Sequence, residues 1–194
     1  MSDLLAALAP VVRTLDALAV AYYVGGSLAS SAHGVARASL DVDLIAALEP
    51  VHARPFVVAL QGSYYLDSDR IEASVRDRRA FNLVHLDTMF KVDIFVARDR
   101  SFDREALRRA RVQVLGEGSE TLRVPIATAE DTILAKLEWF RTGGEVSERQ
   151  WADVVGILKV GGPATDEAYL RQWAAALGVS DLLDRALTAA SGPV

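Results

Sequence analysis

Two aspartates separated by a single residue, Asp41 and Asp43, lie within one apolar run, and Asp93 lies within another. The surrounding segments, "LDVDLIAAL" and "FKVDIFVA", are rich in β-branched and aliphatic residues, which predicts a strand in each case. Residues two apart in a strand point to the same face of the sheet, so Asp41 and Asp43 project together, opposite to Val42. Carboxylates placed side by side on a half-buried sheet repel each other unless one is protonated or a cation binds between them.

Carboxylate oxygens are the ligands that Mg²⁺ prefers, and three carboxylates on neighbouring strands suit two metal ions and phosphate transfer. We therefore take Asp41, Asp43 and Asp93 as candidate metal ligands and catalytic residues. The alternative for the first pair is two exposed aspartates on the open face of an antiparallel sheet.

A glycine pair precedes these strands. "VAYYV" predicts a strand that ends at Gly25-Gly26-Ser27, and the Ala- and Ser-rich residues 27–34 predict a short helix. Glycine lets the backbone approach a ligand closely, and free N–H groups at a helix start suit an anion. Gly25, Gly26 and Ser27 are thus candidate phosphate-binding residues, with an ordinary strand-to-helix turn as the alternative. Arg37, just before the next strand, is either a triphosphate contact or a surface residue of a loop.

This combination resembles the nucleotidyltransferase superfamily, which has the polymerase-beta-like fold. Its signature is Gly-Gly or Gly-Ser, then Asp-x-Asp on the following strand, then a third Asp on a later strand. The matching residues here are Gly26-Ser27, Asp41 with Asp43, and Asp93. The resemblance covers about residues 20–97 and implies a Mg²⁺-dependent enzyme with two metal ions and an NTP as substrate.

The C-terminal part resembles the AbiEii-type nucleotidyltransferase toxins through "EDTILAKLEWFR" and "RQWADVVGIL". That resemblance implies that Lys136 contacts the nucleotide phosphates and that Asp153 helps to position the substrate. Without the resemblance, the position of Lys136 at the edge of an apolar helix stripe favours a lysine that snorkels to solvent over one that binds phosphate. Asp153 faces away from its apolar stripe and is equally consistent with a solvated carboxylate.

The elements that must position these residues divide into two parts. Residues 1–126 alternate helices and strands and include two hairpins, with turns at residues 87–89 and 116–119. Residues 127–194 predict helices only, with Thr128 and Ser147 as N-terminal caps. We expect a mixed α/β (α+β) fold, with a mixed-sheet nucleotidyltransferase core over 1–126 and a helical bundle over 127–194. The predicted helices cover about 3–19, 27–34, 50–61, 102–110, 128–141, 147–160, 166–177 and 180–190, and residues 69–77 predict either a polar helix or a loop.

The amino-acid composition indicates what kind of protein this is and where it is expected to be located. The chain of 194 residues has a net charge of −5, half of its residues are hydrophobic, and it lacks cysteine. These values favour a globular protein, exclude thiolate chemistry, and, without a visible secretory signal, predict a cytoplasmic location. The uncharged residues 17–36 contain too much Gly and Ser for a membrane span. Arginines concentrated between Arg98 and Arg111 either form a polyanion-binding face or, because acids are interleaved, a solvated helix.

We therefore expect an enzyme that moves an NMP from an NTP to a hydroxyl acceptor and releases pyrophosphate. The acceptor is tRNA if the protein is a toxin of a toxin–antitoxin pair, with an antitoxin protein as partner. It is a small molecule if the protein is an aminoglycoside-like antibiotic nucleotidyltransferase. The rival from another class is a non-catalytic nucleotide-binding module of a protein complex.

Overall fold

The structure is a computed structural model that describes residues 3–35, 39, 41–118 and 120–192. The chain forms two compact units. The first combines Met1–Leu28 with Ala38–Ala127, and the second combines Ala29–Arg37 with Thr128–Val194. Segment 29–37 groups with the helical second unit, which the sequence pattern does not suggest.

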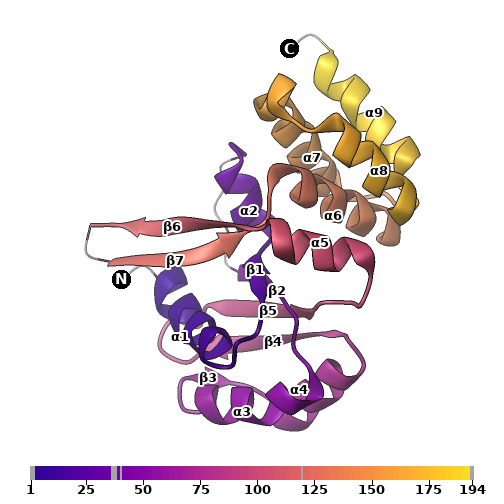
Figure 1. The fold of residues 1–194 in the computed structure, drawn as a ribbon. Helices are drawn as coiled ribbons and strands as arrows, with labels where there is room; N and C mark the ends of the chain where they lie inside the picture. Colours follow the sequence, from indigo (N-terminus) through magenta and orange to yellow (C-terminus); the bar gives the residue numbers. More distant parts are fainter. Residues whose placement is uncertain (1–2, 36–38, 40, 119, 193–194) are drawn as a thin grey trace. The chain divides into compact units, whose positions relative to one another are not determined.

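The first unit is built on a mixed sheet (Figure 1). Among the described residues the sheet has seven strands in the order β3-β4-β5-β2-β1-β7-β6. β2 and β5 run parallel, as do β1 and β7, whereas the other neighbouring strands are antiparallel. The strands are β1 (Tyr22–Val24), β2 (Asp41–Ala46), β3 (Tyr64–Tyr65), β4 (Ala80–His85), β5 (Lys91–Val96), β6 (Arg111–Glu117) and β7 (Glu120–Ile126).

The central strands β2 and β5 have one buried and one half-buried face. Val42, Leu44 and Ala46 of β2 are buried, and Val92, Ile94 and Val96 of β5 are buried beside them. The alternate residues, among them the aspartates of both strands, are only half-buried. This alternation follows from the two-residue period of a strand, and it puts the acids on the face away from the core.

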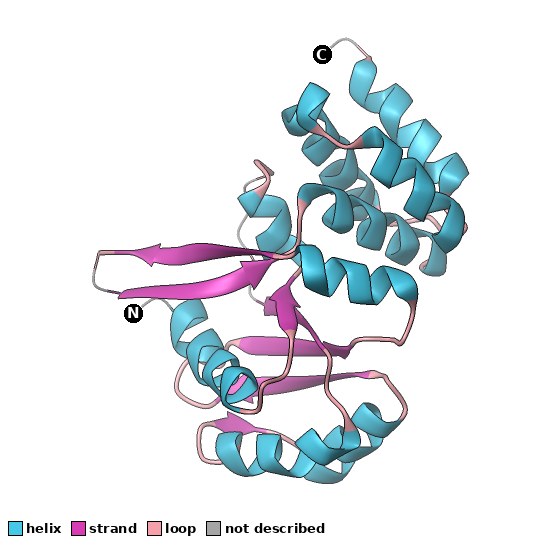
Figure 2. Cartoon of the chain, viewed as in Figure 1, coloured by secondary structure: helices cyan, strands magenta, loops and turns pink. Residues whose placement is uncertain are grey.

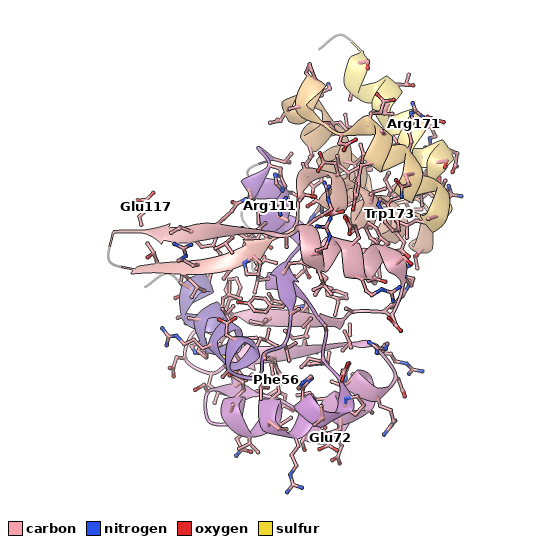
Figure 3. All side chains as sticks on the ribbon, in the orientation of Figure 1. Phe56, Glu72, Arg111, Glu117, Arg171 and Trp173 are labelled. Carbon is pink, nitrogen blue, oxygen red and sulfur yellow. The ribbon has the colours of Figure 1, made fainter. Side chains whose placement is uncertain are left out.

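Helices cover the apolar face of the sheet. α1 packs against β2 and β5, and α4 packs against β4. Phe56 of α3, which is labelled in Figure 3, is fully buried. Its ring meets that of Phe81 of β4 edge-on, with the ring centroids 6.0 Å apart. The helices of this unit are α1 (Asp3–Ala17), α3 (Pro50–Leu60), α4 (Ser68–Arg76), α5 (Ser101–Arg109) and the first residues of α2 (Gly26–Ala32).

The second unit contains no strand in its described part (Figure 2). Its helices are the rest of α2 from Ala29 onward, α6 (Ala129–Thr142), α7 (Glu148–Gly161), α8 (Glu167–Leu177) and α9 (Ser180–Ser191), with a short 3₁₀ turn, η1 (Gly162–Ala164). The predicted caps are confirmed, because Thr128 and Ser147 accept hydrogen bonds from the backbone N–H groups of Asp131 and Gln150. Such caps satisfy N–H groups that the helix itself leaves unpaired.

The predicted mixed α/β fold with a C-terminal helical bundle is confirmed. Within the described part of the chain, no helix is both long enough and apolar enough to cross a bilayer.

Candidate functional site

The candidate site lies on the half-buried face of β2 and β5. Because these strands are parallel and in register, Asp43 lies directly beside Asp93, and Asp41 lies directly beside Lys91. All four side chains point to the same face, since they alternate with the buried residues. The structure thus brings together the three acids that the sequence singled out. Leu40, the predicted first residue of this strand, and Arg37 lie outside the described residues.

A lysine ammonium lies among these carboxylates. Lys91 Nζ is 2.7 Å from Asp93 Oδ2 and 3.9 Å from Asp41 Oδ2. The hydrogen bond to Asp93 raises the pKa of Lys91 above its usual range, with further contributions from the charges of Asp93, Asp41 and Asp43. Sequence reasoning overlooked Lys91, although its spacing of two residues from Asp93 already puts both side chains on one face of a strand.

Asp41 has a second partner. The Ser39 hydroxyl donates a 2.7 Å hydrogen bond to Asp41 Oδ1. This contact fixes one carboxylate oxygen, whereas Oδ2 faces the lysine. Sequence reasoning also overlooked Ser39, since a serine two residues before an aspartate is a common pattern without a distinctive signal.

The glycine bend packs directly against the acids. The Gly25 N–H donates to the Asp43 carbonyl at 2.9 Å, which continues the pairing of β1 with β2 into the bend. Gly26 has a φ of +55°, and a Cβ at this position would lie 1.7 Å from Asp43 Oδ2. Glycine is therefore required for its left-handed backbone and for the space that the Asp43 carboxylate takes. Ser27, the next residue, is buried.

The donor chemistry of this face fits a hard divalent cation, because three carboxylates on two paired strands lie beside a glycine bend that leaves room for one of them. Among the described residues, however, no three Asp, Glu, His or Cys side chains are arranged to hold a metal ion in their present positions. The assignment of Asp41, Asp43 and Asp93 as metal ligands stays a prediction.

Lys136 and Asp153 belong to the second unit and form a buried ion pair. Lys136 Nζ is 2.8 Å from Asp153 Oδ2, and the two side chains are 8% and 5% exposed. Lys136 also donates to Gln150 Oε1 at 3.2 Å, and the Ser30 hydroxyl donates to Asp153 Oδ2 at 3.3 Å. The interpretations of Asp153 as a solvated carboxylate and of Lys136 as a lysine that snorkels to solvent are wrong, because α6 and α7 pack together and enclose both groups. Their predicted roles toward a nucleotide stay predictions.

Three of the six arginines between Arg98 and Arg111 pair with acids of the same segment. Arg100 bonds Asp103 at 2.6 Å, Arg108 bonds Glu105 at 2.7 Å, and Arg104 pairs with Asp99. These pairs favour the interpretation of a solvated helix face with charges of both signs.

Comparison with known proteins shows the fold. No family model and no curated protein matches this sequence. The structure is similar to that of an antigenic nucleotidyltransferase-like protein from Paracoccidioides brasiliensis, with a TM-score of 0.53 and 18% identity over 97% of this chain and 94% of that chain. The fold is that of nucleotidyltransferase-like proteins.

A second similar structure with this nucleotidyltransferase-like fold is the antibiotic-resistance factor ANT(2'')-Ia. The two structures have a TM-score of 0.53 and 13% identity over 93% of this chain and 96% of that chain. The resemblance seen in the sequence therefore holds at the level of the fold. The narrower likeness to the AbiEii-type toxins stays a prediction.

Proposed function

We propose that the protein is a nucleotidyltransferase that moves an NMP from an NTP to a hydroxyl group of an acceptor and releases pyrophosphate. The observation that carries the proposal is the pairing of Asp43 with Asp93 on parallel strands, beside a glycine bend that packs on Asp43. This arrangement occurs within a nucleotidyltransferase-like fold. A fold alone does not define an activity, so the proposed activity rests on the chemistry of these residues.

Asp41, Asp43 and Asp93 are the residues that would hold Mg²⁺, in agreement with their oxygen donors and shared face. Bound Mg²⁺ would offset the negative charge that develops on the α-phosphate and on the leaving group.

The chain's own groups bind and orient the reactants. Gly25, Gly26 and Ser27 hold the triphosphate at the bend, where glycine permits close approach of the backbone. Asp93 accepts the proton of the acceptor hydroxyl. The acceptor oxygen forms a bond to the α-phosphorus, the bond from that phosphorus to the bridging oxygen breaks, and pyrophosphate departs with the electron pair.

We propose a small molecule as the acceptor rather than tRNA. ANT(2'')-Ia, one of the similar structures, is an antibiotic-resistance factor. The internal pairing of Arg100, Arg104 and Arg108 also reduces the basic charge that the segment offers to a nucleic acid. A tRNA acceptor, with an antitoxin partner, is the alternative that the experiment separates.

The test is label transfer from each α-labelled NTP, with Mg²⁺, to a panel of aminoglycosides and other hydroxyl-bearing drugs, tRNA and lysate proteins. We expect labelled small molecules with the wild-type protein and none with Asp43→Asn. Asp87→Asn, an exposed residue of the turn between β4 and β5, is the matched control and should retain activity. Label on tRNA, with growth arrest on expression, would identify a toxin instead. No label on any acceptor would favour the non-catalytic binding module.

A further inference from the structure

The face that carries the acids also carries a fixed positive charge. Asp41 and Lys91 form one neighbouring pair across β2 and β5, and Asp43 and Asp93 form the next pair along the strands. Three carboxylates and one ammonium therefore share a small area, and the carboxylates outnumber the cation. Such a cluster attracts further positive charge, and any cation that enters it must compete with Lys91 for the carboxylates.

The ammonium lies where a cation would bind. Lys91 Nζ contacts Asp93 Oδ2 at 2.7 Å and faces Asp41 Oδ2 at 3.9 Å, so it engages two of the three proposed metal ligands. The side chain of Lys91 is 43% exposed, whereas that of Asp93 is 19% exposed. A partly exposed lysine on a flexible stem can leave a carboxylate at little cost, because water solvates the released ammonium.

We propose that Lys91 is a displaceable counter-ion that competes with the divalent cation for Asp93 and Asp41 and so sets the metal affinity of the site. This inference rests on the proposed function, since it takes these aspartates as metal ligands. Without a metal, the ammonium reduces the repulsion among the carboxylates. When a divalent cation binds, Lys91 must release Asp93, and its positive charge nearby opposes the ion.

A purely structural role for Lys91 makes a different prediction. A half-exposed ion pair that only stabilises the fold contributes little, and its removal would lower the melting temperature without strengthening metal binding. Competition instead predicts a gain of affinity when the charge is removed, which a loss of structure does not produce.

The experiment is calorimetric titration of the full chain with Mn²⁺ in the absence of nucleotide. Removal of one positive charge a few ångströms from a divalent ion should strengthen binding by about tenfold, so we expect that gain for Lys91→Met. Lys91→Arg keeps the charge and should bind Mn²⁺ like the wild type. Lys159→Met removes an exposed lysine of α7 as the matched control and should also leave the affinity unchanged.

Two further results separate this inference from the proposed function. Asp93→Asn should weaken Mn²⁺ binding, and if it does while Lys91→Met binds no more tightly than the wild type, the role of Lys91 is overturned alone. If Asp93→Asn leaves Mn²⁺ binding unchanged, the proposed metal site is overturned together with the role of Lys91. Equal gains for Lys91→Arg and Lys91→Met would also contradict competition by charge.

Discussion

The substitution Gly26→Ala adds a single methyl group and tests how closely the glycine bend packs against Asp43. Its φ of +55° is unfavourable for alanine, and the added Cβ would lie 1.7 Å from Asp43 Oδ2, 2.6 Å from Asp43 Cγ and 2.9 Å from Asp43 Cβ. The backbone strain costs about 1–2 kcal/mol. The carboxylate can rotate away, but the contact with Asp43 Cβ remains, and overpacking of this kind adds about 1–3 kcal/mol. Gly26→Ala should therefore lower the free energy of unfolding by roughly 2–5 kcal/mol.

Thermal unfolding followed by circular dichroism measures this effect. For a protein of this size, each kcal/mol shifts the melting temperature by about 2–4 °C, so we expect a decrease of roughly 4–20 °C. Gly178→Ala is the matched control, because Gly178 has a φ of +70° and a Cβ added there would meet nothing within 4 Å beyond its own helix and its chain neighbours. That variant should show the backbone cost alone, about 1–2 kcal/mol.

A double-mutant cycle tests whether the cost of Gly26→Ala beyond that of Gly178→Ala comes from the Asp43 side chain. In the Asp43→Gly background both the carboxylate and the Cβ of residue 43 are gone, so the cost of Gly26→Ala should approach that of Gly178→Ala. The reasoning is refuted if Gly26→Ala is no more destabilising than Gly178→Ala, or if its excess cost is the same with and without the Asp43 side chain.

The remaining predictions concern the helical unit. Lys136→Met leaves the buried Asp153 carboxylate without its ion partner and should destabilise the protein by about 3–5 kcal/mol in urea unfolding. The double variant Lys136→Met with Asp153→Leu should recover most of that loss, and no recovery would show that the charge pair is not the cause. Tyr169→Phe removes the 2.6 Å hydrogen bond from the Tyr169 hydroxyl to Asp131 Oδ1 and should cost about 1.5–3 kcal/mol, because the acceptor is charged. An unchanged unfolding midpoint for Tyr169→Phe would contradict that assignment.

Local patterns predict the strands and helices because the period of the apolar residues matches the secondary structure. The alternation of Val42 and Leu44 with Asp41 and Asp43 predicts β2 and the shared direction of its acids. The caps at Thr128 and Ser147 indicate the helix starts, since a single side chain satisfies one of the first N–H groups.

Long-range pairing does not follow from local patterns. The parallel register that puts Asp43 beside Asp93 depends on how two strands separated by α3, β3, α4 and β4 meet in one sheet. No local pattern sets that register. The chemistry of three carboxylates on apolar strands and the resemblance to nucleotidyltransferases indicated that the acids meet, but neither gave the pairing of Asp43 with Asp93.

The burial of the charged residue Asp153 does not follow from the sequence pattern either. The apolar stripe of α7 predicts which of its residues are buried by hydrophobic packing. Because the stripe is made up of apolar residues only, it cannot predict that Asp153 is buried. Asp153 is nevertheless buried, because Lys136 of α6 supplies the opposite charge, and a residue type that is costly to bury alone becomes tolerable as a pair.

The measurement that tests the central claim most directly is pyrophosphate release from NTP and Mg²⁺ with an acceptor, compared between the wild type and Asp93→Asn. We expect steady release from the wild type, release from Asp87→Asn at the same rate, and none above background from a folded Asp93→Asn protein. Release at the wild-type rate from Asp93→Asn would contradict the claim that the acids of β2 and β5 form the centre of nucleotidyl transfer.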